Sequence, residues 1–199
     1  MKTERQALKA LLANETTDID AVAELLNSME ETSRVHAIRG LGKKAQIRLW
    51  EAAEGRTSSL DDIVPPGERP AVEVIHAGKN SLPLFTQFEK RFCRVDGDNS
   101  TLYGYNEGPT RKVVGPGYFI TTFDSARGEV GINYYNVPPA DARLPSGWPP
   151  IRPNERGLSR FVYAQMIDYL RRVSDHVTIG RAVRKGKVTN NYFLLCRTT

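Results

Sequence analysis

The amino-acid sequence predicts an α+β fold, with a helical N-terminal segment followed by a mostly antiparallel sheet that has helices packed on one face. Three observations lead to this prediction. Apolar residues repeat at helical spacing through the first fifty-odd positions. From residue 71 onward, short alternating segments are separated by Gly-rich and Pro-rich turns. A longer helical pattern begins at Ser159 and supplies a helix to cover the sheet.

The N-terminal segment reads as three or four short helices. Leu8 and Leu12 lie on one face of the first helix, and Thr17 or Asp18 can cap the second. The Gly-Leu-Gly run at 40–42 separates the third helix from the fourth. Residues 56–70 are rich in Ser, Thr and Pro and read as an extended connection. The predicted boundary therefore separates a helical segment at 1–64 from an α+β domain at 71–199.

Strands and two helices are predicted within 71–199. A short helix is expected after Ser81, because Leu84, Phe85, Phe88 and Phe92 follow at helical spacing. A second helix is expected after Ser159. Its predicted buried stripe consists of Val162, Met166, Tyr169, Leu170 and Val173. Strands are expected at 71–76, 102–105, 112–114, 118–123, 129–137, 177–183 and 188–197.

The composition is typical of a folded protein that does not need disulfide bonds for stability. Hydrophobic residues make up 40% of the 199 positions and charged residues 26%. Cys93 and Cys196 are too few to form a disulfide framework, which favours a reduced, cytoplasmic protein. No segment approaches the ~18 apolar residues needed to span a bilayer, so no membrane partner is predicted. No metal-ligand spacing or cofactor motif is present, so neither a metal nor a cofactor is predicted.

The positive charge is concentrated near the C-terminus. The net charge is +5, yet residues 143–199 alone carry 11 Lys and Arg against 3 Asp and Glu. An excess of this kind favours anionic partners. The long Pro-rich loop at 138–157 adds a second indication of function, because structureless loops of about 20 residues are uncommon in compact domains.

The favoured function is the binding of a small anionic molecule in a pocket of the α+β domain. Such pockets combine an apolar floor with a few convergent polar groups. Candidate side chains lie near predicted strand ends, on the short predicted helix and in the Pro-rich loop. They are Lys79, Asn80, Arg91, Tyr105, Asn154, His176 and Arg181. The pattern does not decide whether any reaction is catalysed.

Nucleic-acid binding is the main alternative. The run from Ile38 to Lys44 resembles the hairpin of helix-hairpin-helix modules, in which a Gly-apolar-Gly turn presents amides and lysines to a phosphate. The resemblance covers about ten residues and departs from the family at Gln46, where a small apolar residue is usual. It implies phosphate contacts from Lys43 and Lys44. The basic C-terminal hairpin would add Arg184, Lys185 and Lys187.

A third possibility is a protein–protein adaptor that docks partners through the helical segment at 1–64.

Overall fold

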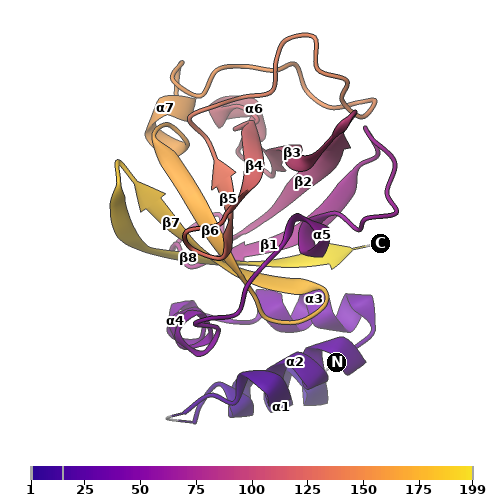
Figure 1. The fold of residues 1–199 in the computed structure, drawn as a ribbon. Helices are drawn as coiled ribbons and strands as arrows, with labels where there is room; N and C mark the ends of the chain where they lie inside the picture. The colour runs from indigo at the N-terminus through magenta and orange to yellow at the C-terminus, as the bar shows by residue number, and fades with distance from the viewer. Residues whose placement is uncertain (1, 15, 199) are drawn as a thin grey trace.

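The computed structural model, which describes residues 2–14 and 16–198, is built around a closed barrel of eight antiparallel strands (Figure 1). Each strand pairs with the next along the chain, and β1 also pairs with β8, which closes the barrel. The strands are β1 (Val74–Asn80), β2 (Gln87–Val95), β3 (Asp98–Glu107), β4 (Phe119–Asp124), β5 (Glu129–Asn133), β6 (Met166–Arg172), β7 (Val177–Arg184) and β8 (Lys187–Thr198).

The predicted α+β fold, an open sheet with helices packed on one face, is therefore wrong. Two of its helices are strands in the structure. The segment that carries Phe88 and Phe92 is β2, and the segment around Met166 and Leu170 is β6. Only Ser159–Val162, helix α7, remains helical in the second case. The opposite error occurs at 112–114, where a strand was predicted and α6 (Arg111–Val114) forms.

Burial on both sides of the barrel wall explains the misread pattern at β6. Leu170 belongs to the core inside the barrel, whereas its neighbour Tyr169 packs against a separate cluster under the helices. A strand with apolar residues on both faces loses the simple alternation of period two. Its apolar positions then fall by chance at spacings of three and four, which are also typical of a helix.

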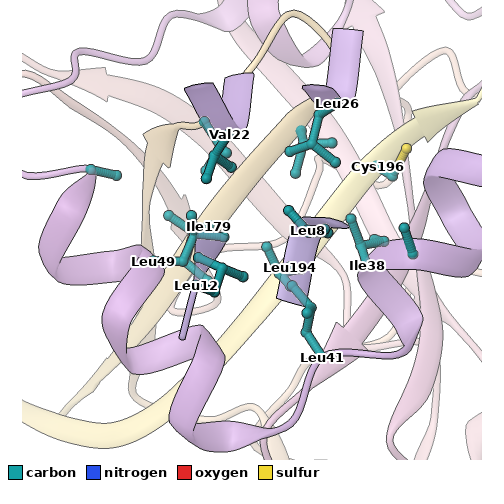
Figure 2. Packing of buried hydrophobic residues seen from close by; sticks show 14 of the residues in the cluster. Leu8, Leu12, Val22, Leu26, Ile38, Leu41, Leu49, Ile179, Leu194 and Cys196 are labelled. Atoms are coloured by element: carbon teal, nitrogen blue, oxygen red, sulfur yellow. The ribbon is translucent and has the colours of Figure 1, made fainter. Parts of the chain in front are cut away.

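The N-terminal helices cover the outer surface of β7 and β8, with the third and fourth helices against the strands and the first packed on the second and third (Figure 1). They are α1 (Lys2–Leu11), α2 (Ile19–Ser28), α3 (Glu31–Arg39) and α4 (Lys43–Ala52), so the predicted helical segment is confirmed as helical. Asp18 is the N-cap of α2, because its carboxylate accepts from the amides of Asp20 and Ala21. Figure 2 shows Leu8, Leu26 and Leu49 in one apolar cluster with Ile179 and Leu194 of the strands. The predicted boundary near residues 65–70 stays a prediction.

A short helix, α5 (Leu60–Ile63), closes one end of the barrel. Its apolar residues Leu60 and Ile63 join the core inside the barrel. Three buried or half-buried side chains donate to consecutive main-chain carbonyls at the end of this helix. Arg197 donates to Asp62 O at 2.8 Å, His76 Nε2 to Ile63 O at 2.8 Å and Arg94 to Val64 O at 2.5 Å. Side chains from the barrel interior thus satisfy the carbonyl groups at the end of the helix that closes the barrel.

His76 should make this end of the barrel sensitive to acid. Burial lowers the pKa of His76 from its usual 6.5 to about 4 in the folded protein, so the unfolded chain binds more protons between these values. The free energy of unfolding should therefore keep its full value above pH 6.5 and fall by about 3 kcal/mol as the pH drops to 4. Urea unfolding across this range should show the loss in the wild type. His76→Gln, which keeps a donor for Ile63 O, should show a flatter profile; an unchanged slope would contradict the assignment.

Candidate functional site

The end of the barrel opposite α5 contains a cavity of ≈ 560 Å³. Its lining includes Phe88 and Phe193 from the barrel wall and Phe161 from α7. The side chains farther along the interior, among them Phe92 and Leu102, belong to the filled core and do not line the cavity. The barrel is therefore half filled, with an open half that is mostly apolar. This volume lies within the usual range for small-molecule sites.

A cluster of four buried polar side chains lies where the open half meets the filled half. It consists of Lys90 on β2, Asn106 on β3, Tyr134 just after β5 and Asp168 on β6, and all four line the cavity. Lys90 Nζ lies 3.3 Å from Asp168 Oδ2 and donates to Asn106 Oδ1 at 2.9 Å. It also donates to the Tyr134 hydroxyl. The three donors of the ammonium group thus have three partners.

One acceptor of this cluster is left without a partner. Asp168 is 3% exposed, and its Oδ1 atom accepts no hydrogen bond within the described residues. A buried carboxylate oxygen in this state costs free energy unless something donates to it. Because Asp168 lines the cavity, a ligand with an N–H or O–H group could supply the missing donor.

Three phenylalanine rings surround the Lys90 ammonium, and each lies over a glycine of the neighbouring strand. The cross-strand pairs are Gly78 with Phe88, Gly104 with Phe119, and Gly180 with Phe193. A Cβ atom added to these glycines would lie 2.7, 2.3 and 2.1 Å from the facing ring, so no larger residue fits. The ring centroids lie 5.7, 5.1 and 5.2 Å from Lys90 Nζ, close enough for cation–π attraction.

Burial opposes the charges of Lys90 and Asp168. It lowers the pKa of Lys90 and raises the pKa of Asp168, while the attraction between the two groups acts in the other direction for both. Burial also raises the pKa of Tyr134 well above 10, which keeps its hydroxyl protonated. The cluster is therefore a set of hydrogen-bonding groups whose charges compensate one another within the cavity.

The charged side chains nearer the mouth are only partly compensated. Arg111 Nε lies 2.7 Å from Glu107 Oε1, so this pair is neutral overall. Arg184 also lines the cavity, but it donates to the main-chain carbonyls of Arg160 and Phe161 and forms no ion pair within the described residues. Arg184 is thus the cavity-lining cation with no carboxylate to balance it.

Comparison with models of known families, with curated proteins and with solved structures finds no match for this chain. The site must therefore be interpreted from its own chemistry.

A second hollow of ≈ 560 Å³ lies between α3 and the outer surface of β1 and β2. Its lining alternates in charge, with Arg5 and Arg39 beside Glu31 and Glu89. Unlike the barrel cavity, it has no cluster of fully buried polar side chains in its lining. The barrel cavity is accordingly the better candidate for a specific site.

The seven residues predicted from the sequence to bind a ligand are not brought together. Asn80 lines the barrel cavity, but the other six do not. Arg91 forms ion pairs with Glu73 and Glu89. The ring centroids of Tyr105 and Trp148 lie 4.9 Å apart. A ligand role for these residues stays a prediction.

The remaining candidates have structural partners. Asn154 fastens the Pro-rich loop by donating to Tyr118 O and Tyr134 O at 2.8 and 2.9 Å. His176 lies beside Arg197, Arg181 lies over the Tyr192 ring, and Lys79 pairs with β8 at Leu194.

The residues of the nucleic-acid alternative fall into two groups. Lys43 and Lys44 begin α4 in the helical layer, whereas Arg184, Lys185 and Lys187 form the β7–β8 hairpin at the cavity end of the barrel. Gln46, the departure from the helix-hairpin-helix pattern, is fully buried and donates to Leu41 O at 3.2 Å.

Other reactive groups give no site. Burial raises the pKa of the Cys93 thiol to about 12, which disfavours a nucleophilic thiolate. Within residues 2–14 and 16–198, no group of three His, Cys, Asp or Glu is placed to hold a metal ion. In the same part of the chain, no helix has the length and apolar character needed to cross a bilayer.

The sequence reasoning missed Lys90, Asn106, Tyr134 and Asp168. A signal was present, because Lys90 and Asp168 each interrupt an apolar segment where a charge is costly. Both segments were interpreted as helices, and on a helix these positions fall on the solvent side. Only the strand assignment turns them inward.

Proposed function

We propose that this protein binds one small molecule inside the barrel, with an apolar body in the open half and a hydrogen-bond donor at Asp168. The observation that carries the proposal is the half-filled interior, an apolar cavity with a buried polar cluster at its base. Barrels of eight strands are just wide enough either to be filled by side chains or to hold one small ligand. The unpartnered Asp168 Oδ1 favours the second use.

The proposed ligand is anionic, as expected from the sequence, but its acidic group lies near the mouth of the barrel cavity. Lys90 is balanced by Asp168 at the base, and Arg111 by Glu107 at the mouth. Arg184 is left to attract a carboxylate, sulfonate or phosphate on the outer end of the ligand. The molecule that fits best is therefore amphipathic, with a donor at its buried end and an acidic group near the mouth.

Filling the cavity should abolish binding. Ala182 is buried on β7, pairs with Asp168 of β6 and lines the cavity, so Ala182→Phe would fill the space beside the polar cluster. Titration with anilinonaphthalene sulfonate, an apolar fluorophore carrying one sulfonate, should show a single saturable site in the wild type and a loss of at least about 30-fold in affinity in the variant. Ala126→Phe, at an exposed turn at the α5 end, is the matched control and should bind normally.

Substitution of Arg184 tests the acidic end of the ligand separately from the cavity. Arg184→Gln should weaken the sulfonate probe by about tenfold yet leave neutral phenylnaphthylamine unaffected, because a charge-assisted contact is worth roughly 1.5–3 kcal/mol. If Ala182→Phe and Ala126→Phe bind the sulfonate probe equally well, the barrel interior is not the site. If only the response of Arg184→Gln fails, the cavity stands and the acidic end of the ligand does not.

A further inference from the structure

The rim of the cavity exposes more apolar surface than an open binding site needs. Leu84 and Phe85 lie in the β1–β2 loop and are 70% and 66% exposed, and Phe161 of α7 is 61% exposed. All three also line the mouth of the cavity. Val113 on α6, next to the lining residue Val114, is 71% exposed. Several exposed apolar side chains at one end of a protein indicate an interaction surface.

The backbone of the β1–β2 loop holds one of these rings outward at some cost. Phe85 has φ +52°, in the left-handed region that bulky residues rarely adopt. Such a conformation is strained, and strained residues cluster at functional positions.

Basic side chains surround the apolar rim. Lys112 lies on α6, Arg160 on α7 and Lys187 at the start of β8, and all three are exposed outside the cavity lining. Three connections at this end, at 81–86, 108–118 and 185–186, contain no Asp or Glu, and the fourth, at 134–165, contains four arginines against Asp141 and Glu155. The cavity end of the barrel thus combines apolar side chains with positive charge.

The opposite end of the barrel carries carboxylates that are paired with arginines. In an up-and-down barrel, successive connections alternate between the two ends. Asp96, Asp124 and Asp175 lie at the three connections of the α5 end, and α5 itself contains Asp61 and Asp62. Each of these five carboxylates forms an ion pair with an arginine side chain. The basic rim residues, which form no ion pair within the described residues, therefore lie at the same end as the exposed apolar side chains.

We propose that this rim docks on the surface of an anionic lipid bilayer. Apolar side chains would enter the boundary between headgroups and acyl chains, while lysine and arginine contact the headgroup phosphates. The aliphatic residues Leu84 and Val113 favour a membrane over a nucleic acid, because they cannot stack on bases as aromatic rings do. The sequence prediction of no membrane partner rested on the absence of a spanning segment, which surface docking does not need.

Vesicle flotation tests this proposal. The full-length protein should bind vesicles of mixed phosphatidylglycerol and phosphatidylcholine, bind pure phosphatidylcholine far more weakly, and dissociate as salt is raised. The triple variant Lys112→Glu, Arg160→Glu, Lys187→Glu should lose about 100-fold or more in affinity, since each basic residue near such a surface contributes about fivefold and the glutamates add repulsion. The control Lys9→Glu, Lys43→Glu, Lys44→Glu has the same net charge but changes only the helical layer, and it should bind like the wild type.

A second variant tests the apolar part of the rim. Leu84→Asn with Phe85→Asn removes both side chains, and asparagine tolerates the left-handed backbone at 85. Binding to anionic vesicles should fall by about tenfold or more, with a circular dichroism spectrum like that of the wild type. Equal losses in the two triple variants, or no binding to anionic vesicles by the wild type, would overturn the proposal. So would a rim that binds single-stranded DNA or RNA and not vesicles.

The three rim lysine and arginine positions lie outside the cavity. Binding of the fluorescent probe by the rim triple variant therefore reports separately on the proposed ligand site.

Discussion

Replacing Lys90 with methionine should destabilise the barrel by about 3–5 kcal/mol at pH 7, because it leaves the Asp168 carboxylate buried without a cation. Asp168→Leu should cost a similar amount for the converse reason. The double variant should be closer to the wild type than either single variant, since an apolar pair of similar volume leaves no unpaired charge. Guanidinium unfolding of the four proteins gives the coupling energy directly.

The pH dependence of Lys90→Met gives an independent check. Without Lys90, the pKa of Asp168 should rise further above its usual value, because burial still raises it while the charge and hydrogen bond of Lys90 no longer lower it. A carboxyl group whose pKa is raised on folding stabilises the protein when protonated and loses that contribution as the pH rises through the folded pKa. Relative to the wild type, the variant should therefore gain stability as the pH falls below the folded-state pKa of Asp168, until the ordinary pKa of the unfolded chain is reached.

A surface ion pair serves as the control for the Lys90 result. Arg143 Nη1 lies 3.1 Å from Asp96 Oδ2, and both side chains are more than half exposed. Arg143→Met should change stability by less than about 1 kcal/mol. If the two single variants at Lys90 and Asp168 have costs that simply add in the double variant, the pair is not coupled and the cluster does not act as a unit.

Gly104→Ala should be the most damaging small substitution in the barrel wall. Its Cβ would lie 2.4 Å from the main-chain oxygen of Arg91 and 2.3 Å from the Phe119 ring, so both the strand and the ring must shift. The expected cost is about 3 kcal/mol, at the upper end of the range for overpacking. Because Phe119 lies 5.1 Å from Lys90 Nζ, probe affinity should fall as well.

Gly131→Ala on β5 is the matched control for Gly104→Ala. The nearest atom to its added Cβ is at 3.5 Å, an ordinary contact distance. The substitution should be neutral or slightly stabilising, because alanine restricts the unfolded chain more than glycine does. Equal destabilisation by both alanines would show that strand glycines are needed for backbone reasons and not for the close approach of the rings.

The sequence predicted the helices from their apolar stripes and several strands from the glycine-containing turns that bound them, at Gly117, Gly128 and Gly186. Helices α1–α4 and the strands around 119–124, 129–133, 177–184 and 187–198 were expected and are present. The strands β2 and β6 were not expected, because side chains are buried both inside and outside the barrel at these positions. Closure was also invisible, since the pairing of β1 with β8 joins residues that no local pattern connects.

The candidate site depended on those same two strands. Lys90 and Asp168 lie on opposite sides of the barrel order, on β2 and β6, and only closure brings them within 3.3 Å. A charged residue in an apolar segment can be recognised from sequence, but its partner cannot. Asn80 is a predicted residue that does line the cavity, because it ends a strand whose position was nearly correct.

The pairing of β1 with β8 has a consequence for synthesis on the ribosome. Ile75 and Thr198 are hydrogen-bonded across this seam although 123 residues separate them. Until 187–198 emerge, the nascent sheet has two unpaired edges, and α3 and α4 lack the part of their packing surface that β8 provides. Folding should therefore be completed late, and the emerging chain is exposed to edge-to-edge association during that interval.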